Sequence, residues 1–517
     1  MSMQRARSPR GVRPLLPLVT SALFLLCLAL VPGAARAATI YVAPGDNLQA
    51  AVNLAQPGDT IVLEAGATYV GPVTLPVKSG ASYITIQSSA LASLPAGVRV
   101  TPASASLMPK IVSPGAGDPA LRTDPGAHHF QFLGVEFAKQ TPDVLVYDLV
   151  ALGDGSSAQN SLAQVPHHFV FDRCYVHGAP ATQLKRGVAV NSGETSITNS
   201  HISDVKSNSQ DSQAVAGWNG PGPFRLVNNY LEASGENVLF GGATGHIQGV
   251  NPADIEIRRN HFNKPTAWRG VWMVKNLLEL KRAERVVIDG NLFENCWASG
   301  QEGFAVLFTT RNDDGRTPWG TIRDVAFTNN VVRHAASGVY VIGRDNYFFS
   351  QQGSNIVVRN NLFEDIDGPA YGGRGTFLMM VASADLRVEH NTVFQSGSLG
   401  IVFYTDFATE DGGKVRGMAN TGFVFRDNIV SKGEYGLFGD GGLEGAAALS
   451  VFAPAAQFAG NVIMWPTAPV GYPAGNFHAA NKDAVGFVSG ATGNYRLSSS
   501  SPYAGRATDG ADSGRAG

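Results

Sequence analysis

The stretch "IDGNLF", residues 288–293, carries a pattern that recurs along most of the chain. An apolar residue is followed by two variable residues, an asparagine, one variable residue and a second apolar residue. Successive copies lie 26 to 39 residues apart, which indicates a solenoid with loops of variable length. The asparagine stands at Asn229, Asn260, Asn291, Asn330, Asn361, Asn391, Asn428 and Asn461, and three degenerate earlier copies place Val135, Cys174 and Ser200 there.

The residues around each asparagine favour short strands. Val, Ile and Phe dominate over five or six residues, and none of the copies contains a convincing long helix. Stacked parallel strands about 4.8 Å apart would bring the asparagines into one column. Each side-chain amide can then hydrogen-bond to the next asparagine, so that the buried turn is satisfied. The sequence therefore predicts an all-β solenoid with an asparagine ladder.

The N-terminal part strengthens this interpretation. The stretch "NLQAAVNLAQPGDTIVLEAGATY", residues 47–69, resembles the opening of the pectin lyase-like superfamily. The resemblance implies a right-handed parallel β-helix, here of about 11–13 coils, with a capping helix over residues 47–56 and "PGDTIVL" as the first strand. It also implies one domain over residues 38–517, with clear coils over 130–465 and C-terminal coils and a tail over 466–517.

Residues 1–37 read as an export signal. Basic residues precede the apolar run of residues 15–30, and Ala35-Arg36-Ala37 is a small-x-small cleavage site. The remaining chain has 34 basic and 41 acidic side chains, a formal charge of −7, which argues against nucleic-acid binding. We expect a secreted protein, extracellular or periplasmic, that is monomeric and free of the membrane after cleavage.

Two cysteines, Cys174 and Cys296, remain in the exported chain. They fall about four coils apart, roughly 19 Å along the axis of a solenoid with 4.8 Å between strands. That separation exceeds the reach of a disulfide. Two free, buried thiols are predicted.

Each coil carries a second strand signal, such as those beginning at Arg269 and Ser337, and long insertions repeatedly follow this strand. Because they leave the same strand, we expect them to line one rim of one face, where a sugar chain could bind among aromatic and charged groups. Ordinary loop variation is the alternative. The insertions are residues 217–223, 243–254, 309–320, 343–354 and 404–417, and the candidate substrate-binding residues are Arg186, Trp218, Asn219, Trp272, Arg311, Arg344 and Asp345.

One coil is strongly basic. Residues 258–285 hold eight basic and two acidic side chains, which favours an anionic ligand at that place. Strand alternation in "KNLLELK", residues 275–281, is expected to bury Asn276, Leu278 and Leu280 and to expose Lys275, Leu277, Glu279 and Lys281. The candidate catalytic residues are Lys275, Lys281, Glu279 and Glu302.

A charged row of this kind suits β-elimination of an acidic, uronate-containing polysaccharide. A cation neutralises the uronate carboxylate, and a base takes the adjacent proton. A lysine beside other cations has a lowered proton affinity and can be that base. The resemblance adds Ca²⁺ as a candidate cofactor, because pectate lyases use it. The catalytic signatures of pectate lyases, chondroitinase B-like alginate lyases, epimerases and polygalacturonases are nevertheless missing.

Three alternatives stay open. The row can be a solvated ladder of ion pairs. The groove can belong to a non-catalytic carbohydrate-binding or cell-envelope surface protein. Two facing carboxylates would instead support hydrolysis.

The pairs His128-His129 and His167-His168 recur just before strands. Metal binding is one interpretation, but strand alternation predicts that one histidine of each pair points inward. The preferred explanation is therefore that the pairs recur only because successive coils have similar sequences, and no metal ligands are assigned from the sequence.

Overall fold

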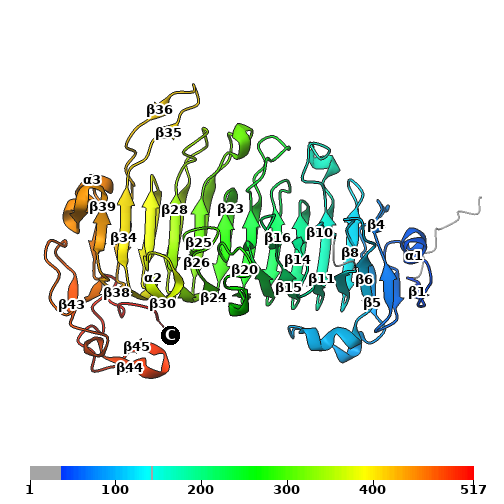
Figure 1. The fold of residues 1–517 in the computed structure, drawn as a ribbon, viewed down its shortest axis with the longest axis horizontal. Coiled ribbons are helices and arrows are strands. Elements are labelled where there is room, and N and C mark those ends of the chain that lie inside the picture. Colours follow the sequence, from blue (N-terminus) through cyan, green and yellow to red (C-terminus); the bar gives the residue numbers. More distant parts are fainter. Residues whose placement is uncertain (1–36, 141–143, 517) are drawn as a thin grey trace, which may run out of the picture. The chain divides into compact units, whose positions relative to one another are not determined.

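The computed structural model describes residues 37–140 and 144–516, and residues from Ala37 on form one compact unit. The proposed signal over residues 1–37 lies, apart from Ala37, outside the described residues. Three parallel sheets dominate the unit, and each coil contributes one short strand to each sheet (Figure 1). The prediction of a right-handed parallel β-helix is confirmed.

Sheet A contains 14 strands, and its strands precede the asparagine turns. In spatial order they are β1 (Thr39–Val42), β2 (Thr60–Leu63), β5 (Ile84–Ser88), β8 (His128–Leu133), β11 (His167–Asp172), β14 (Gly193–Thr198), β17 (Phe224–Val227), β20 (Ala253–Arg258), β23 (Ala283–Asp289), β26 (Ile322–Thr328), β29 (Ser354–Arg359), β32 (Ala384–Glu389), β37 (Val424–Arg426) and β41 (Gln457–Ala459).

Sheet B contains 14 strands, and most of them follow the asparagine turns. They are β3 (Thr68–Val70), β6 (Lys110–Ser113), β9 (Glu136–Lys139), β12 (Tyr175–His177), β15 (His201–Val205), β18 (Tyr230–Ala233), β21 (His261–Asn263), β24 (Leu292–Cys296), β27 (Val331–Ala335), β30 (Leu362–Ile366), β33 (Thr392–Gln395), β38 (Ile429–Ser431), β42 (Val462–Met464) and β43 (Phe477–Ala479).

Sheet C contains 13 strands and carries the long loops. They are β4 (Val73–Leu75), β7 (Leu121–Thr123), β10 (Val146–Leu152), β13 (Leu184–Val190), β16 (Gln213–Gly217), β19 (Glu236–Phe240), β22 (Leu278–Leu280), β25 (Phe304–Thr309), β28 (Ser337–Ile342), β31 (Leu378–Val381), β34 (Ser398–Phe403), β39 (Gly436–Gly439) and the antiparallel β40 (Leu443–Glu444).

The asparagine ladder forms as predicted. Asn260 Nδ2 donates to Asn291 Oδ1 at 3.1 Å, and the backbone N–H of Asn260 donates to the same oxygen at 2.9 Å. Asn291 bonds in the same way to Asn330. The residue before each ladder asparagine has a positive φ, for example 54° at Arg259 and 59° at Asn329. This left-handed turn re-aims the chain from sheet A to sheet B.

The core fills the space between the three sheets. Phenylalanines from neighbouring coils stack inside it, such as Phe262 on Phe293 with ring centroids 4.3 Å apart. Cys174 and Cys296 are free and fully buried, as predicted, and burial raises the pKa of each thiol to about 12. None of the helices in the described part of the chain is long and apolar enough to cross a membrane.

The two ends differ from expectation in detail. The capping helix forms as α1 (Leu48–Leu54) with Asn47 as its N-cap, but "PGDTIVL" supplies the second strand, because β1 pairs outside it. At the other end the last parallel strand is β43. The chain then forms an antiparallel hairpin of β44 (Phe487–Ser489) and β45 (Asn494–Leu497), and Thr508 returns to bond Asp427.

Short elements also lie in the loops and at the C-terminal end. They include the helices α2 (Gly368–Tyr371) and α3 (Ala446–Phe452), the hairpin of β35 (Phe407–Ala408) with β36 (Lys414–Val415), and several single-turn 3-10 helices.

Candidate functional site

The five long insertions all leave strands of sheet C, as predicted. They follow β16, β19, β25, β28 and β34, so that their origins stack along one edge of that sheet. Figure 1 shows loops and the β35–β36 hairpin projecting from the same side of the stack. The outer face of sheet C is therefore flanked by loops and is the natural place for a site on this scaffold.

Five charged residues meet on this face, and we call them the lysine–carboxylate cluster: Asp211, Glu236, Lys275, Glu279 and Lys281. The Lys275 ammonium forms an ion pair with Asp211 and lies 3.6 Å from Glu236 Oε1. Lys281 Nζ lies 3.7 Å from Glu279 Oε1. Both predicted catalytic lysines thus sit beside carboxylates from neighbouring coils or from their own strand.

Polar neighbours fix the two buried carboxylates of the cluster. Gln213 Nε2 donates to Glu236 Oε2 at 2.7 Å, and Thr309 Oγ1 donates to Glu279 Oε1 at 3.0 Å. Asn276 Nδ2 donates to Glu279 Oε2 at 3.1 Å. Glu236 is 1% and Glu279 2% exposed, whereas the Asp211 side chain is 48% exposed. Solvent and ligands therefore meet Asp211 and the lysines first.

The expected exposure in "KNLLELK" is wrong for two residues, because Leu277 and Glu279 are buried. Leu277 and Leu278 both enter the core, whereas Asn276 is fully buried, as predicted, and donates to Glu279. Strand β22 begins only at Leu278, and the stretch from Arg269 that was expected to be a strand is a loop after the short turn Thr266–Trp268. Two consecutive inward residues bend the chain and shift the alternation by one position.

The surrounding charges favour the protonated, positively charged form of Lys275. Burial acts to lower the pKa of Lys275, but Glu236 and Asp211 outweigh it, and the pKa is raised above its ordinary value. The expectation that neighbouring cations lower its proton affinity is therefore wrong. Burial and the nearby Glu279 raise the pKa of Glu236.

The basic coil does not form a single anionic-ligand site. Arg258 pairs with Asp289 at 2.7 Å and Arg285 with Asp254 at 2.7 Å, both on sheet A. Lys264 is fully buried on backbone carbonyls, away from any ligand. Coiling of the chain distributes these basic residues over different faces and the interior. The excess of positive charge in the sequence therefore does not form one basic surface patch.

Several residues that were predicted to bind substrate instead stabilise the loops by hydrogen bonds to other parts of the protein. Trp218 is 8% exposed, its indole N–H donates to Gly155 O at 2.9 Å, and the Arg186 guanidinium lies 4.5 Å from its ring. Asn219 is buried and donates to the carbonyls of Asp154 and Gln159, each at 2.9 Å. Neither side chain offers a free face to a sugar, which corrects that part of the prediction.

The loop after β28 is built in the same way. Asp345 is buried and accepts hydrogen bonds from the backbone of Asn312 and Tyr347, each at 2.8 Å. Arg311 bonds to Asn346 at 3.0 Å and Arg344 to Gln352 at 3.1 Å. Two aromatic side chains of this loop face solvent, since Tyr347 is 75% and Phe348 46% exposed.

Two further candidates contact residues outside the cluster. Glu302 is exposed and pairs with Arg374 at 2.8 Å. Trp272 is half-buried against an apolar cluster that contains Trp268, Val274 and Trp297.

Register brings the predicted Arg186 together with three residues that the sequence analysis missed, namely Asp148, Gln213 and Glu236. The four occupy equivalent positions on β10, β13, β16 and β19. Aligning the strand that precedes each insertion, coil by coil, would have placed Gln213 and Glu236 in one row. Asp211 stands before its strand and offers no such signal.

The cluster does not fit a Ca²⁺ ion. The Glu236 and Glu279 carboxylates are already bonded to Gln213, Asn276 and Thr309, and both lie beside ammonium groups. Within the described residues, the groups of metal-ligating side chains that converge on one point lie elsewhere, at His129, His167 and His168 and at His390, Asp427 and Asp509.

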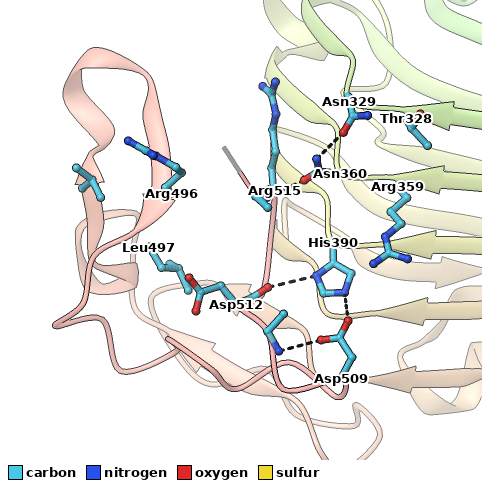
Figure 2. Close-up of a pocket in the computed structure, with 13 residues that line it drawn as sticks. Thr328, Asn329, Arg359, Asn360, His390, Arg496, Leu497, Asp509, Asp512 and Arg515 are labelled. Carbon is cyan, nitrogen blue, oxygen red and sulfur yellow. Dashed lines mark hydrogen bonds and ion pairs between the residues drawn. The ribbon is translucent and has the colours of Figure 1, made fainter. Parts of the chain in front are cut away.

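A cavity of about 760 Å³ also lies away from the cluster. It opens between the coils and the returning C-terminal segment and is lined by Arg359, Arg496 and Arg515, among others (Figure 2). Figure 2 shows His390 bridging Asp509, at 3.0 Å, and the carbonyl of Asp512, at 3.2 Å. A smaller cavity of about 340 Å³ includes Asp148 and therefore lies along the row of sheet C.

Comparison with known proteins places the fold. The chain matches no protein-family model and no curated protein in sequence. A solved structure of an alginate lyase of polysaccharide lyase family 6, AlyGC, superposes with a TM-score of 0.52 at 14% identity, over 85% of this chain. The chain spans 53%, about half, of that lyase.

Two other solved structures are more distant. XylC in complex with xylose gives a TM-score of 0.45 at 10% identity, with 86% of each chain covered. The pectate lyase Pel9A gives 0.34 at 14% identity, over 92% of this chain and 95% of that one. Three stacked parallel sheets, the asparagine ladder and the likeness to AlyGC together identify the fold as a right-handed parallel β-helix.

Proposed function

We propose that this protein acts on an extracellular, acidic polysaccharide and cleaves it beside a uronate by β-elimination. The observation that carries the proposal is the lysine–carboxylate cluster on the loop-flanked face of sheet C. The fold shared with an alginate lyase supports a uronate polymer as the substrate class. Export, which the N-terminal segment predicts, would bring the protein to such a polymer.

In this proposal the two lysines neutralise the uronate carboxylate. Lys275 holds its proton firmly because Glu236 and Asp211 raise its pKa. Charge neutralisation makes the adjacent C–H more acidic, and a nearby base then takes that proton. Asp211 is the exposed carboxylate next to Lys275 and has this role, while Glu279 positions Lys281 at 3.7 Å.

The step balances without an oxidant or reductant. Asp211 takes the proton from the carbon next to the carboxylate, and the electrons of that C–H bond form a carbon–carbon double bond. The glycosidic C–O bond breaks, and the leaving oxygen takes a proton from water. The new chain end is unsaturated and absorbs ultraviolet light.

The test is a panel of uronate polymers followed by ultraviolet absorbance, with the purified protein and its variants. We expect Lys275→Ala and Lys281→Ala each to lower kcat/KM by about 100-fold or more, since each removes charge stabilisation of the transition state. Lys432→Ala is the matched control, because Lys432 is also 14% exposed in its side chain and pairs with Glu444 at 2.9 Å, in a distant coil. Equal rates in all three variants would contradict the proposal.

Non-catalytic carbohydrate binding is the second candidate, because Lys275 and Lys281 are already ion-paired. Binding of a uronate polymer in calorimetry, without new unsaturated ends or reducing ends, would establish it in place of cleavage. New reducing ends without ultraviolet absorbance would instead indicate hydrolysis.

A further inference from the structure

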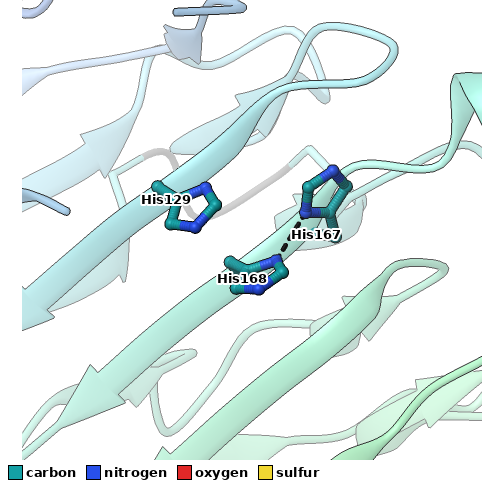
Figure 3. A group of neighbouring side chains, drawn as sticks. All are labelled: His129, His167 and His168. Carbon is teal, nitrogen blue, oxygen red and sulfur yellow. Dashed lines mark hydrogen bonds between the residues drawn. The ribbon is translucent and has the colours of Figure 1, made fainter. Parts of the chain in front are cut away.

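Two histidine pairs meet on the outer face of sheet A. His128 and His129 open β8, His167 and His168 open β11, and His128 pairs in register with His167. Figure 3 shows the rings of His129, His167 and His168 grouped together above these two strands. The expectation that one histidine of each pair points inward is wrong.

A left-handed residue in each strand explains why both histidines face outward. His129 and His168 each have a φ of 60°, while Ala127 and Phe130 on either side of the first pair are fully buried. A residue in this conformation interrupts the alternation of the strand and keeps two consecutive side chains on one face. Histidine is among the residues that tolerate it.

The conformation recurs along sheet A, but the histidines do not. Equivalent positions near the starts of later strands hold Glu194, Asp254, Arg285, Asp324 and Asn355, all with a positive φ. The backbone conformation therefore requires a residue that accepts a positive φ, but it does not require histidine. It does not explain why two consecutive coils each carry a pair of histidines.

The nitrogen atoms converge. Ring nitrogens of His129, His167 and His168 lie within 4.8 Å of one another. The Nδ1 atoms are 2.5 Å apart within the His167-His168 pair, and the rings of His129 and His168 stack at 4.2 Å. We propose that His129, His167 and His168 bind one late first-row divalent cation, such as Zn²⁺, Ni²⁺ or Cu²⁺, and thereby clamp β8 to β11.

Ligand chemistry selects this class of ion. Imidazole suits Zn²⁺, Cu²⁺ and Ni²⁺, whereas Ca²⁺ and Mg²⁺ take oxygen ligands. Bonds of about 2.0–2.1 Å in a tetrahedral site place ligand atoms about 3.3 Å apart. Side-chain rotations must therefore separate the His167 and His168 nitrogens, now 2.5 Å apart, and bring the nitrogens that lie up to 4.8 Å apart closer together. The rings are half-buried, which leaves the fourth position open to water.

Glu194 supplies the outer support that such sites have. Its Oε2 atom lies 2.6 Å from His168 Nε2, on the next strand, β14. A proton on Nε2 leaves Nδ1 of His168 with its lone pair, facing His167. Burial and the neighbouring imidazoles also lower the pKa of His129 and His167.

The experiment measures metal binding directly and does not depend on the proposed polysaccharide activity. The purified full chain is stripped with a chelator and titrated with Zn²⁺ by calorimetry and with Co²⁺ by visible absorption. We expect one ion per chain, a tetrahedral Co²⁺ spectrum and a higher unfolding temperature in the presence of Zn²⁺. Absence of binding by the native protein would overturn the proposal.

Variants locate the site. The double variant His129→Asn/His168→Asn keeps a residue type that accepts a positive φ, and we expect it to lose the ion while its circular dichroism stays native. Glu194→Gln is expected to weaken binding about 10-fold. His246→Asn, in a loop of sheet C, is the control and should bind as the native protein does.

The second group of metal-ligating side chains is tested with Asp509→Asn, which removes a carboxylate from His390 and Asp427. We expect it to bind the ion normally. Loss of the ion in this variant, or unchanged affinity in the double histidine variant, would contradict the assignment.

Discussion

The Lys275 ammonium lies 3.6 Å from the buried carboxylate of Glu236, one coil away. The contact exists because coils stack, so that a loop residue before β22 reaches the first residue of β19. The contact couples the protonation of the Lys275 ammonium to the charge of the buried Glu236 carboxylate. This relationship gives the first prediction.

Glu236→Gln should move the pH dependence of the proposed activity. The native carboxylate helps to raise the pKa of Lys275, so its removal lowers that pKa. If the charged ammonium is the active form, activity is lost as pH rises through the pKa of Lys275, and this loss should begin at a lower pH in the variant. The measurement is kcat/KM against pH. An acidic limb that shifts to lower pH, with the alkaline limb fixed, would identify Lys275 as the base instead.

Removal of one ladder residue should destabilise the coils on both sides. Asn291 Nδ2 donates to Ile257 O and Asn330 Oδ1, and its Oδ1 accepts from Asn260. Asn291→Ala leaves several of these buried groups unpaired and is expected to cost about 2–4 kcal/mol in unfolding free energy. Chemical denaturation measures the change. Asn53→Ala, at an exposed asparagine in α1, should differ from the native protein by less than about 0.5 kcal/mol.

Lys264 should be structural. Its fully buried ammonium donates to the carbonyls of Ala233 and Gly235, each at 2.7 Å, and burial lowers its pKa to about 8. Lys264→Met keeps the volume but leaves these carbonyls without a donor, at an expected cost of roughly 3–5 kcal/mol. Thermal unfolding measures it. A variant as stable as the native protein would show that the buried ammonium adds no net stability.

Glu136 should contribute to acid sensitivity. Burial acts to raise its pKa, but hydrogen bonds from His177, at 2.8 Å, and Lys110, at 2.9 Å, outweigh it and lower the pKa. A carboxylate with a lowered pKa in the folded state stabilises the fold above its unfolded pKa of about 4.3. That contribution is lost as pH falls through the lower folded value.

The comparison is between the native protein and Glu136→Gln. The unfolding free energy of both proteins is measured at intervals of about one pH unit, from about pH 7 to about pH 3. We expect it to fall less steeply with decreasing pH in the variant. Parallel curves would mean that other carboxylates control acid unfolding.

The repeat made much of the fold predictable. One asparagine per coil, such as Asn291, fixes the turn, and the apolar residues around it fix two strands. The strand β22 was harder, because Leu277 and Leu278 both enter the core and break the alternation. The C-terminal hairpin was also missed, since its strands pair with each other and leave no repeat signal.

The candidate site was only partly predictable. Lys275, Glu279 and Lys281 stand close together in the sequence and lie together in the structure. Asp211 and Glu236 come from other coils. Trp218 and Asp345 looked like ligand contacts because aromatic and acidic residues often are, yet both hold their loops in place.

The sequence by itself determined the solenoid, the ladder and the free cysteines, because each follows from the order of residues within one coil and the spacing between coils. Only the tertiary structure decided which charges meet. Lys275 contacts Glu236, and His129 contacts His168, because coils of unequal length stack on one another. Arg282 follows Lys281 directly in the sequence, yet it is buried and pairs with Asp313 instead. Register between coils depends on loop length and on left-handed residues that shift the alternation, so contacts between coils follow from the folded backbone and not from proximity along the chain.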